Sequence, residues 1–241
     1  TSPPYGVGID YGEYVDTIEN LRQMLPKMAS VWIAALVDGG FAVVNFGDVL
    51  PGRAAAGTDS ICEYPMALEH WPPFRAAGWT LWSRRIWCKP GAAIGSSRHC
   101  ISSNRAASNF EHIWTWKRPG NPPVREQICG QFQSQAGWID STHGVKLGVS
   151  LSIHGAGMPV TIAAPMVAIH SRPWAIVYEP FSGSGTTIIA AQQLGRRCFG
   201  IELSAHYVDL AVLRWQKLTG QNANLSSTGQ TFDELTAERT A

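Results

Sequence analysis

Two short motifs contain residue types suited to catalysis and to cofactor binding. Ser2-Pro3-Pro4-Tyr5 stands at the N-terminus, and Glu179-Pro180-Phe181-Ser182-Gly183-Ser184-Gly185-Thr186-Thr187 lies near the other end. In the second motif, Gly183 and Gly185 let the backbone approach a ligand closely, and the helix predicted behind them offers free N–H groups to a polar or anionic group. A glycine-rich surface turn without a ligand is the alternative interpretation.

The elements around the glycine-rich motif resemble half of a nucleotide-binding fold. An apolar run at 175–178 predicts a buried strand, 188–194 a helix, and 197–201 a second strand that ends at Glu202. Glu202 follows Gly183 by 19 positions (202 − 183). This is close to the offset of about 20 residues at which a Rossmann-like βαβ unit places a carboxylate on ribose hydroxyls. The pattern therefore predicts a nucleoside ligand.

The residues after the glycines narrow the choice of nucleoside. A phosphate-binding P-loop needs a lysine after its last glycine, whereas Thr186 and Thr187 stand here, which disfavours a nucleoside triphosphate. A dinucleotide fingerprint needs a third small residue where this chain has Ile188, which disfavours NAD and FAD.

The motif Pro-Phe-Ser-Gly-Ser-Gly-Thr-Thr, followed by Gly200-Ile201-Glu202-Leu203, resembles the S-adenosylmethionine-binding motifs of DNA amino-methyltransferases. The family's usual opening aspartate is a glutamate here, which keeps the charge on a longer side chain. The resemblance implies S-adenosylmethionine as the cofactor. It implies cofactor contacts from Glu179, Phe181, Gly183, Ser184, Gly185, Thr186 and Glu202, and from His154, which precedes a helix in a family pattern that covers the methionine end.

Ser2-Pro3-Pro4-Tyr5 by itself is also typical of a polyproline ligand. Paired with the cofactor motif, it resembles the catalytic motif of the same family, which implies catalytic roles for Ser2, Pro3, Pro4 and Tyr5. An exocyclic base amine is a poor nucleophile, because its lone pair is delocalised into the ring. The Ser2 hydroxyl and the Pro3 carbonyl are acceptors for its two hydrogens, and Tyr5 offers a face for stacking a base that leaves the duplex.

The first residue of the catalytic motif favours cytosine N4 as the target. Family members that begin with Ser more often modify cytosine N4, and those that begin with Asp more often modify adenine N6, which stays the alternative. Methylation of cytosine C5 needs a cysteine nucleophile, typically in a Pro-Cys pair, and no cysteine follows a proline here. The zinc deaminase signatures His-x-Glu and Pro-Cys-x-x-Cys are also absent.

A locally basic segment predicts a DNA-binding surface. The net charge of the chain is only +1, yet the stretch from Arg84 to Arg125 holds one acid, Glu111, among its cations. Phosphate contacts are expected of such a stretch, although a solvated basic face is the alternative. The expected DNA-binding residues are Arg84, Arg85, Arg98, Arg105, Lys117, Arg118 and Arg125.

The expected fold class is α/β: a Rossmann-like class I methyltransferase sheet with helices on both faces, plus a small irregular DNA-recognition insertion. The catalytic half is expected at 1–117, the target-recognition region at 118–152, the S-adenosylmethionine-binding half at 153–220, and a tail at 221–241. Periodicity and punctuation predict further helices at 17–37, 61–77, 160–170 and 205–219 and strands at 41–46 and 79–87.

Composition limits the class of protein further. The chain has 241 residues and five scattered cysteines without a C-x-x-C pair, which disfavours a zinc knuckle and a disulfide framework. No apolar run approaches the length of a membrane span, and no signal segment is apparent. The expectation is a cytoplasmic protein of bacterial or phage origin that binds double-stranded DNA, without a metal or a membrane. A homodimer and a cognate restriction nuclease are compatible with the resemblance.

One feature departs from the family pattern. In the permuted family, the catalytic motif normally follows a strand from the middle of the sheet, whereas this sequence starts one residue before Ser2. Either another segment replaces that strand, or the sequence is a fragment. A catalytically impaired DNA-binding relic is therefore the rival to an active enzyme.

Overall fold

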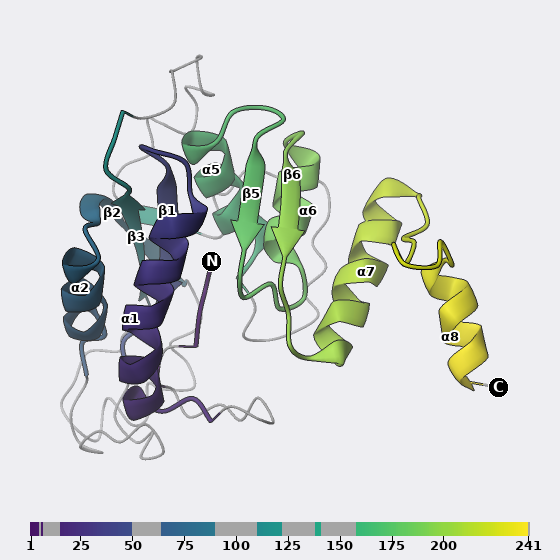
Figure 1. The fold of residues 1–241 in the computed structure, drawn as a ribbon, viewed down its shortest axis with the longest axis horizontal. Coiled ribbons are helices and arrows are strands. Elements are labelled where there is room, and N and C mark those ends of the chain that lie inside the picture. Colours follow the sequence, from purple (N-terminus) through teal and green to yellow (C-terminus); the bar gives the residue numbers. More distant parts are fainter. Residues whose placement is uncertain are drawn as a thin grey trace. The chain divides into compact units, whose positions relative to one another are not determined.

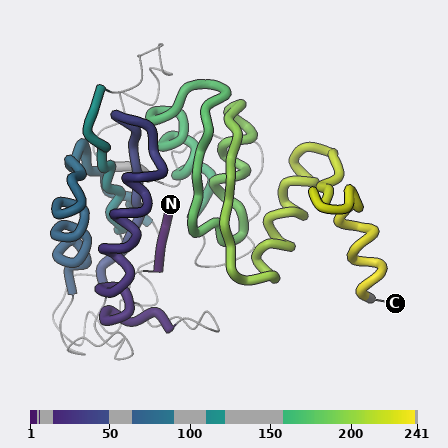
Figure 2. Tube along the Cα trace, in the orientation of Figure 1, coloured from purple at the N-terminus to yellow at the C-terminus, as the bar shows by residue number. Residues whose placement is uncertain are grey.

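The structure is a computed structural model that describes residues 1–4, 6, 15–49, 64–89, 110–121, 138–140 and 158–240 (Figure 1). The chain divides into two compact units, which Figure 2 lets the reader trace by residue number. The first comprises residues 1–145 and 168–170, and the second comprises residues 146–167 and 171–241.

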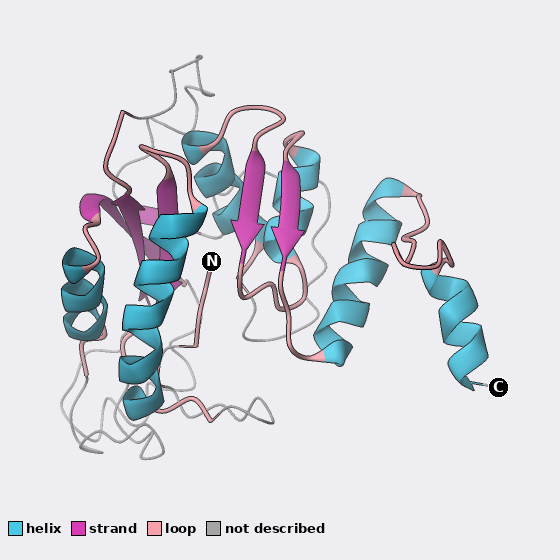
Figure 3. Cartoon of the chain, viewed as in Figure 1, coloured by secondary structure: helices cyan, strands magenta, loops and turns pink. Residues whose placement is uncertain are grey.

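The first unit is built on a four-stranded sheet (Figure 3). Its strands are β1 (Phe41–Phe46), β2 (Thr80–Cys88), β3 (Phe110–Lys117) and β4 (Trp138–Asp140), in the order β1-β3-β2-β4. β3 pairs antiparallel with β1 and with β2, and β4 pairs parallel with β2. The predicted strands at 41–46 and 79–87 are thus confirmed. Both runs are rich in β-branched and aromatic residues, which pack well on a sheet.

Two helices accompany this sheet. α1 (Ile18–Ala35) begins behind the N-cap Thr17, whose Oγ1 accepts a hydrogen bond from the Asn20 N–H at 3.2 Å. The stripe Leu21, Leu25, Met28 and Trp32 is buried, as its helical spacing predicts. α2 (Ala67–Ala76) is shorter than the predicted 61–77; residues 61–63 lie outside the described part.

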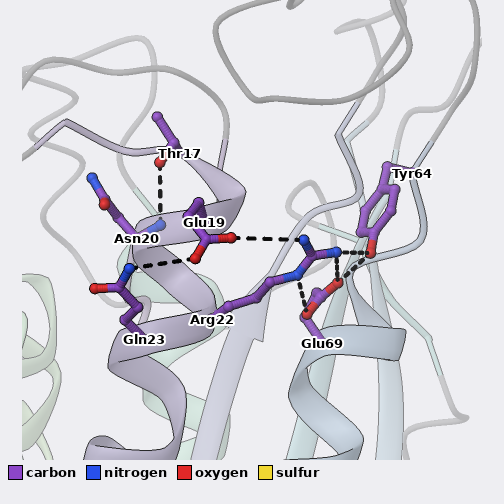
Figure 4. Close-up of polar contacts among 7 residues, drawn as sticks. All are labelled: Thr17, Glu19, Asn20, Arg22, Gln23, Tyr64 and Glu69. Atoms are coloured by element: carbon purple, nitrogen blue, oxygen red, sulfur yellow. Dashed lines mark hydrogen bonds and ion pairs between the residues drawn. The ribbon is translucent and has the colours of Figure 1, made fainter.

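A charged cluster ties α1 to α2 (Figure 4). Arg22 on α1 binds both carboxylate oxygens of Glu69 on α2, at 2.8 and 3.1 Å, and also donates to the Tyr64 hydroxyl at 3.0 Å. These contacts hold the pKa of the Glu69 carboxyl below its ordinary value and raise the pKa of the Arg22 guanidinium. Because the Arg22 side chain is about half exposed, water screens this pair, and its main role is to fix how the two helices align.

The aromatic core of the first unit lies between the helices and the sheet. Phe74 of α2 stacks on Trp116 of β3 with ring centroids 4.9 Å apart, and Phe46 of β1 meets Trp114 edge to face at 5.2 Å. These four rings are buried. The core therefore fixes β1 and β3, and with them the carboxyl end of β1.

The second unit contains the glycine-rich motif. Its described elements are most of α5 (Val160–His170), then β5 (Ile176–Glu179), α6 (Thr186–Gln193), β6 (Arg197–Gly200) and α7 (Ala205–Thr219). β5 and β6 are parallel and adjacent, which makes β5-α6-β6 the predicted βαβ unit. Residues of α5 and α6 form its apolar core, together with half-buried residues such as Val177 and Trp215. The predicted bounds of α5 and α7 are confirmed.

Two expectations need correction in detail. α6 begins at Thr186, two residues before the predicted start, because Gly185 occupies the N-cap position in a left-handed conformation. In the segment expected as a tail, the described residues contain secondary structure: Asn224 forms an isolated β-bridge with Thr231, and α8 (Phe232–Thr240) follows. The Thr231 hydroxyl and the Glu234 carboxylate bond each other's backbone N–H groups, which is a capping box that starts the helix.

Within the described ranges, no helix combines the length and apolar character that a membrane span requires. The same part of the chain shows no cluster of three or more His, Cys, Asp or Glu side chains arranged to hold a metal ion.

Candidate active site

The N-terminal motif starts beside the carboxyl end of β1. The backbone N of Thr1 donates to the Val43 carbonyl at 2.8 Å, and the Asn45 N–H donates to the Thr1 carbonyl at 2.9 Å. This is the bonding of a parallel pair, so Ser2 follows where β1 ends. Pro3 is buried, whereas Ser2 and Pro4 are half-buried. Tyr5 lies outside the described residues.

Polar side chains hold the end of β1 in place. Asn45 is buried and its Nδ2 donates to the His112 carbonyl at 3.1 Å. Asp48 accepts the Met66 N–H at 2.8 Å with one oxygen and lies 3.1 Å from His112 Nε2 with the other. Both carboxylate oxygens of Asp48 thus form contacts that hold the segment after β1. These hydrogen bonds therefore fix the end of β1, next to which Ser2 lies.

The glycine-rich loop joins β5 to α6 and is packed on one side. A Cβ at Gly185 (φ +80°) would lie 2.8 Å from Ala211 Cβ of α7, and a Cβ at Gly200 would lie 2.9 Å from Ser182 Oγ. Gly183 (φ +51°) has nothing within 4 Å of the same position. The loop therefore needs glycine where it packs on α7, and it leaves open space above Gly183 for a ligand.

Glu179 stabilises this loop from the inside. The residue is only 2 % exposed, and its carboxylate accepts the Phe181 N–H at 3.1 Å and the Thr187 hydroxyl at 2.6 Å. Both bonds join Glu179 to the loop itself, and a direct cofactor contact from Glu179 stays a prediction. Thr187, which the sequence did not single out, helps Glu179 to stabilise the loop.

Glu202 is placed as the βαβ pattern predicts, just beyond the carboxyl end of β6. One of its carboxylate oxygens accepts the Gly183 N–H at 2.7 Å and the other accepts the Ser204 N–H at 2.9 Å. A carboxylate has about four acceptor positions, so these two bonds leave capacity for ribose hydroxyls. Glu202 is half-buried beside the open Gly183. The residues present thus fit the nucleoside part of S-adenosylmethionine.

Arg214 of α7 is a further residue that the sequence did not single out. It is 6 % exposed, and its Nη1 donates to the Ser184 carbonyl at 2.5 Å, the Ser184 hydroxyl at 2.9 Å and the Thr186 hydroxyl at 3.2 Å. The hydroxyls of Ser184 and Thr186, expected to bind cofactor, therefore bond the protein itself. Burial lowers the pKa of the guanidinium. A signal existed: Arg214 follows the buried Ala211 by three positions, on the face that α7 buries.

The expected DNA-binding residues differ in their exposure and in their contacts with the protein. Arg84 is exposed on β2, and Arg85 beside it is half-buried, with burial lowering the pKa of its guanidinium. Arg118 pairs with Asp38 at 3.2 Å and also donates to the Leu36 carbonyl. Arg118 thus anchors the segment that follows α1.

Lys117 does not lie near the N-terminal motif. Its side chain donates to the Gly120 carbonyl at 2.6 Å. In the register of β3 against β1, Lys117 lies opposite Phe41, whereas the N-terminal motif lies near Phe46 at the other end of β1. At ~3.4 Å per residue these ends are about 17 Å apart. Arg98, Arg105, Arg125 and the candidate cofactor residue His154 lie outside the described residues.

Comparisons with known proteins agree with this geometry. A family model described as DNA methylase, of the N6 and N4 type, matches residues 1–213. The Type II methyltransferase M.Cfr9I of Citrobacter freundii is 28 % identical over 260 residues, which cover 93 % of this chain and 82 % of that protein.

Solved structures give the same result. A putative DNA modification methylase of Thermus thermophilus, complexed with S-adenosyl-L-methionine, is 25 % identical with a TM-score of 0.64, covering 90 % of this chain and 83 % of that one. The cytosine-N4-specific PvuII DNA methyltransferase shares the fold at a TM-score of 0.67 and 18 % identity, covering 93 % of this chain and 79 % of that one. The chain therefore belongs to the N6/N4 DNA methylase family and is an S-adenosylmethionine-dependent DNA methyltransferase.

Proposed function

We propose that the chain methylates cytosine N4 in double-stranded DNA, on a base swung out of the duplex. The observation that carries the proposal is the placement of Ser2, Pro3 and Pro4 at the carboxyl end of β1, with a serine rather than an aspartate in first position. Adenine N6 is the alternative target within the family.

The motif acts by activating the amine. The Ser2 hydroxyl and the Pro3 carbonyl accept its two hydrogens, which localises the nitrogen lone pair for attack. Bound S-adenosylmethionine supplies an electrophilic methyl group on a sulfonium. As the nitrogen–carbon bond forms, the bond between the methyl carbon and sulfur breaks and the thioether S-adenosylhomocysteine leaves. The methylated amine then loses a proton to Ser2 or to solvent. Pro3 and Pro4 restrict the backbone, so the two acceptors are fixed before the base arrives.

Some residues of the glycine-rich loop contact the cofactor, and others stabilise the loop. Gly183 offers open backbone and Glu202 offers acceptor positions for ribose, and we assign direct contact to these two and to Phe181. Glu179, Ser184 and Thr186 keep the loop in shape through their bonds to Thr187 and Arg214. Gly185 provides the close approach to α7.

Among the expected DNA-binding residues that the structure describes, the exposed Arg84 is the best-supported phosphate contact, because Arg85 is half-buried and Lys117 and Arg118 bond protein groups instead. A homodimer and a cognate restriction nuclease stay predictions. Sedimentation of the purified chain would test the first.

Product analysis tests the proposal. The purified chain is incubated with methyl-labelled S-adenosylmethionine and unmethylated bacterial DNA, and the digested nucleosides are identified by mass. Label on N4-methylcytosine is expected. Label on N6-methyladenine would replace the target, and no label with the cofactor bound would contradict activity of this polypeptide.

A pair of variants tests the role of the motif. Ser2→Ala should abolish transfer and leave cofactor affinity unchanged, because it removes an acceptor for the amine only. Ser30→Ala is the matched control, since the Ser30 hydroxyl bonds the Pro26 carbonyl within its own helix. Equal loss of transfer and of cofactor affinity in Ser2→Ala would contradict this division of roles.

A further inference from the structure

A buried carboxylate holds the backbone just after the N-terminal motif. Asp16 is 0 % exposed, and its Oδ1 accepts the Gly6 N–H at 2.6 Å. Gly6 is the second residue after Pro4. A hydrogen bond buried away from water is electrostatically stronger than an exposed one, so this contact is suited to fixing a loop.

The backbone at Gly6 needs glycine for this contact. Its φ of +82° lies in the left-handed region, and a Cβ there would stand 2.8 Å from Cγ1 of Ile18. Ile18 is the first residue of α1 and is 2 % exposed. The chain therefore passes directly against the start of α1, at a place where a side chain would force it away.

The motif is thus held at both ends by different elements. On one side Thr1 bonds the backbone of β1 at Val43 and Asn45, and on the other Gly6 bonds Asp16 in front of α1. Ser2, Pro3 and Pro4 lie between these two attachments. Since each proline also restricts its own backbone, few conformations connect two fixed ends over so short a span.

We propose that Asp16 is a positioning residue for catalysis, which acts through Gly6 to hold the Ser2 and Pro3 acceptors in place. This inference rests on the proposed function of the motif. Asp16 itself touches neither base nor cofactor in this role. A displacement of about 1 Å in a catalytic group can cost about a hundredfold in rate, so a loosened attachment should be visible in kcat.

Three variants separate positioning from stability. Asp16→Ala removes the acceptor, and Asp16→Asn keeps an oxygen acceptor of nearly the same shape. Thr17→Ala is the matched control: it removes the neighbouring N-cap bond to Asn20 (Figure 4) and weakens the start of α1 without touching Gly6.

Asp16→Ala should lower kcat by at least about tenfold, with the dissociation constant of S-adenosylhomocysteine within twofold of the wild type. Asp16→Asn should restore most of the rate, and Thr17→Ala should keep the wild-type kcat while melting at a lower temperature. Wild-type kcat in Asp16→Ala would overturn the inference. An equal loss of kcat in Asp16→Ala and Thr17→Ala would also overturn it, because helix stability would then explain the effect.

Hydrogen exchange of the Gly6 amide tests its hydrogen bond to Asp16 without an activity measurement. Gly6 should be protected in the wild type and in Thr17→Ala and should exchange faster in Asp16→Ala. An unchanged exchange rate would overturn the inference. A wild-type chain that shows this protection but methylates no DNA would instead contradict the proposed function.

Discussion

Arg214 Nη1 lies 2.5 Å from the carbonyl oxygen of Ser184, so a buried cation on α7 holds the turn of the glycine-rich loop. The same nitrogen also reaches the hydroxyls of Ser184 and Thr186. One guanidinium thereby connects α7 to three atoms of the loop. The loop's shape depends on a helix that follows it by some twenty residues in the sequence.

Replacing Arg214 with Met should weaken cofactor binding by about tenfold, which corresponds to ~1.4 kcal/mol. The three bonds to the loop are lost, while methionine keeps an unbranched apolar side chain at this buried position. Titration calorimetry with S-adenosylhomocysteine measures the change. Lys217→Met is the control, because Lys217 is exposed on the same helix. An unchanged affinity in Arg214→Met would show that the loop keeps its shape without this contact.

Thr187→Val should lower the free energy of unfolding by about 1–3 kcal/mol, because a buried carboxylate loses a donor. The Thr187 hydroxyl donates to Glu179 at 2.6 Å, and valine has nearly the same shape. Urea unfolding provides the measurement. Thr161→Val is the comparison, since the buried Thr161 Oγ1 has no hydrogen-bond partner in the described part of the chain. That variant should be neutral or stabilising, and equal losses in both would contradict the role of Glu179.

Gly185→Ala should impair the loop more than Gly183→Ala. Both positions have positive φ, but only a Cβ at Gly185 would meet Ala211, at 2.8 Å. Gly183→Ala should cost about 1–2 kcal/mol of stability from backbone strain alone. Ala211→Gly, added to Gly185→Ala, should recover part of the loss by removing the clash. Unfolding and S-adenosylhomocysteine affinity are measured together, and the reverse order of severity would show that Gly183 is the packed position.

The first unit should lose stability as the pH falls below about 6.5. His70 is fully buried and stacks on Phe46, with ring centroids 4.1 Å apart, and burial lowers its pKa to about 3. Between pH 6.5 and 3 the unfolded chain binds a proton at His70 and the folded chain does not. Acidification therefore favours unfolding, by up to about 1.4 kcal/mol for each pH unit.

His70→Phe removes this titration and keeps an aromatic ring against Phe46. Its free energy of unfolding, measured by urea titration from pH 7.5 to 4.5, should depend less steeply on pH than that of the wild type. His206→Gln is the control, because it removes an exposed histidine of the second unit. Parallel pH profiles for the wild type and His70→Phe would show that His70 is not the group responsible.

Local patterns were sufficient for the elements that carry the glycine-rich motif. The order strand, glycine turn, helix, strand and acid predicted β5, α6, β6 and Glu202, because hydrophobic periodicity and glycine punctuation act over a few residues. The stripe of α1 and the helix at 205–219 were predictable for the same reason. The helix α8 was not predicted, because it is short and mostly exposed and so carries no apolar stripe beyond its capping box at Thr231 and Glu234.

The supports of the site come from residues distant in the sequence, so only the tertiary structure decided them. Arg214 meets Ser184 across 30 positions, and Asp16 meets Gly6 across a turn whose path no local pattern defines. Local sequence likewise did not show that Glu179 and Arg214 form hydrogen bonds inside the protein, whereas Glu202 is only half-buried. The residue types predicted the chemistry. Which side chains face a ligand and which hold the loop depends on packing, because burial and hydrogen bonding are set by the neighbours that folding brings together.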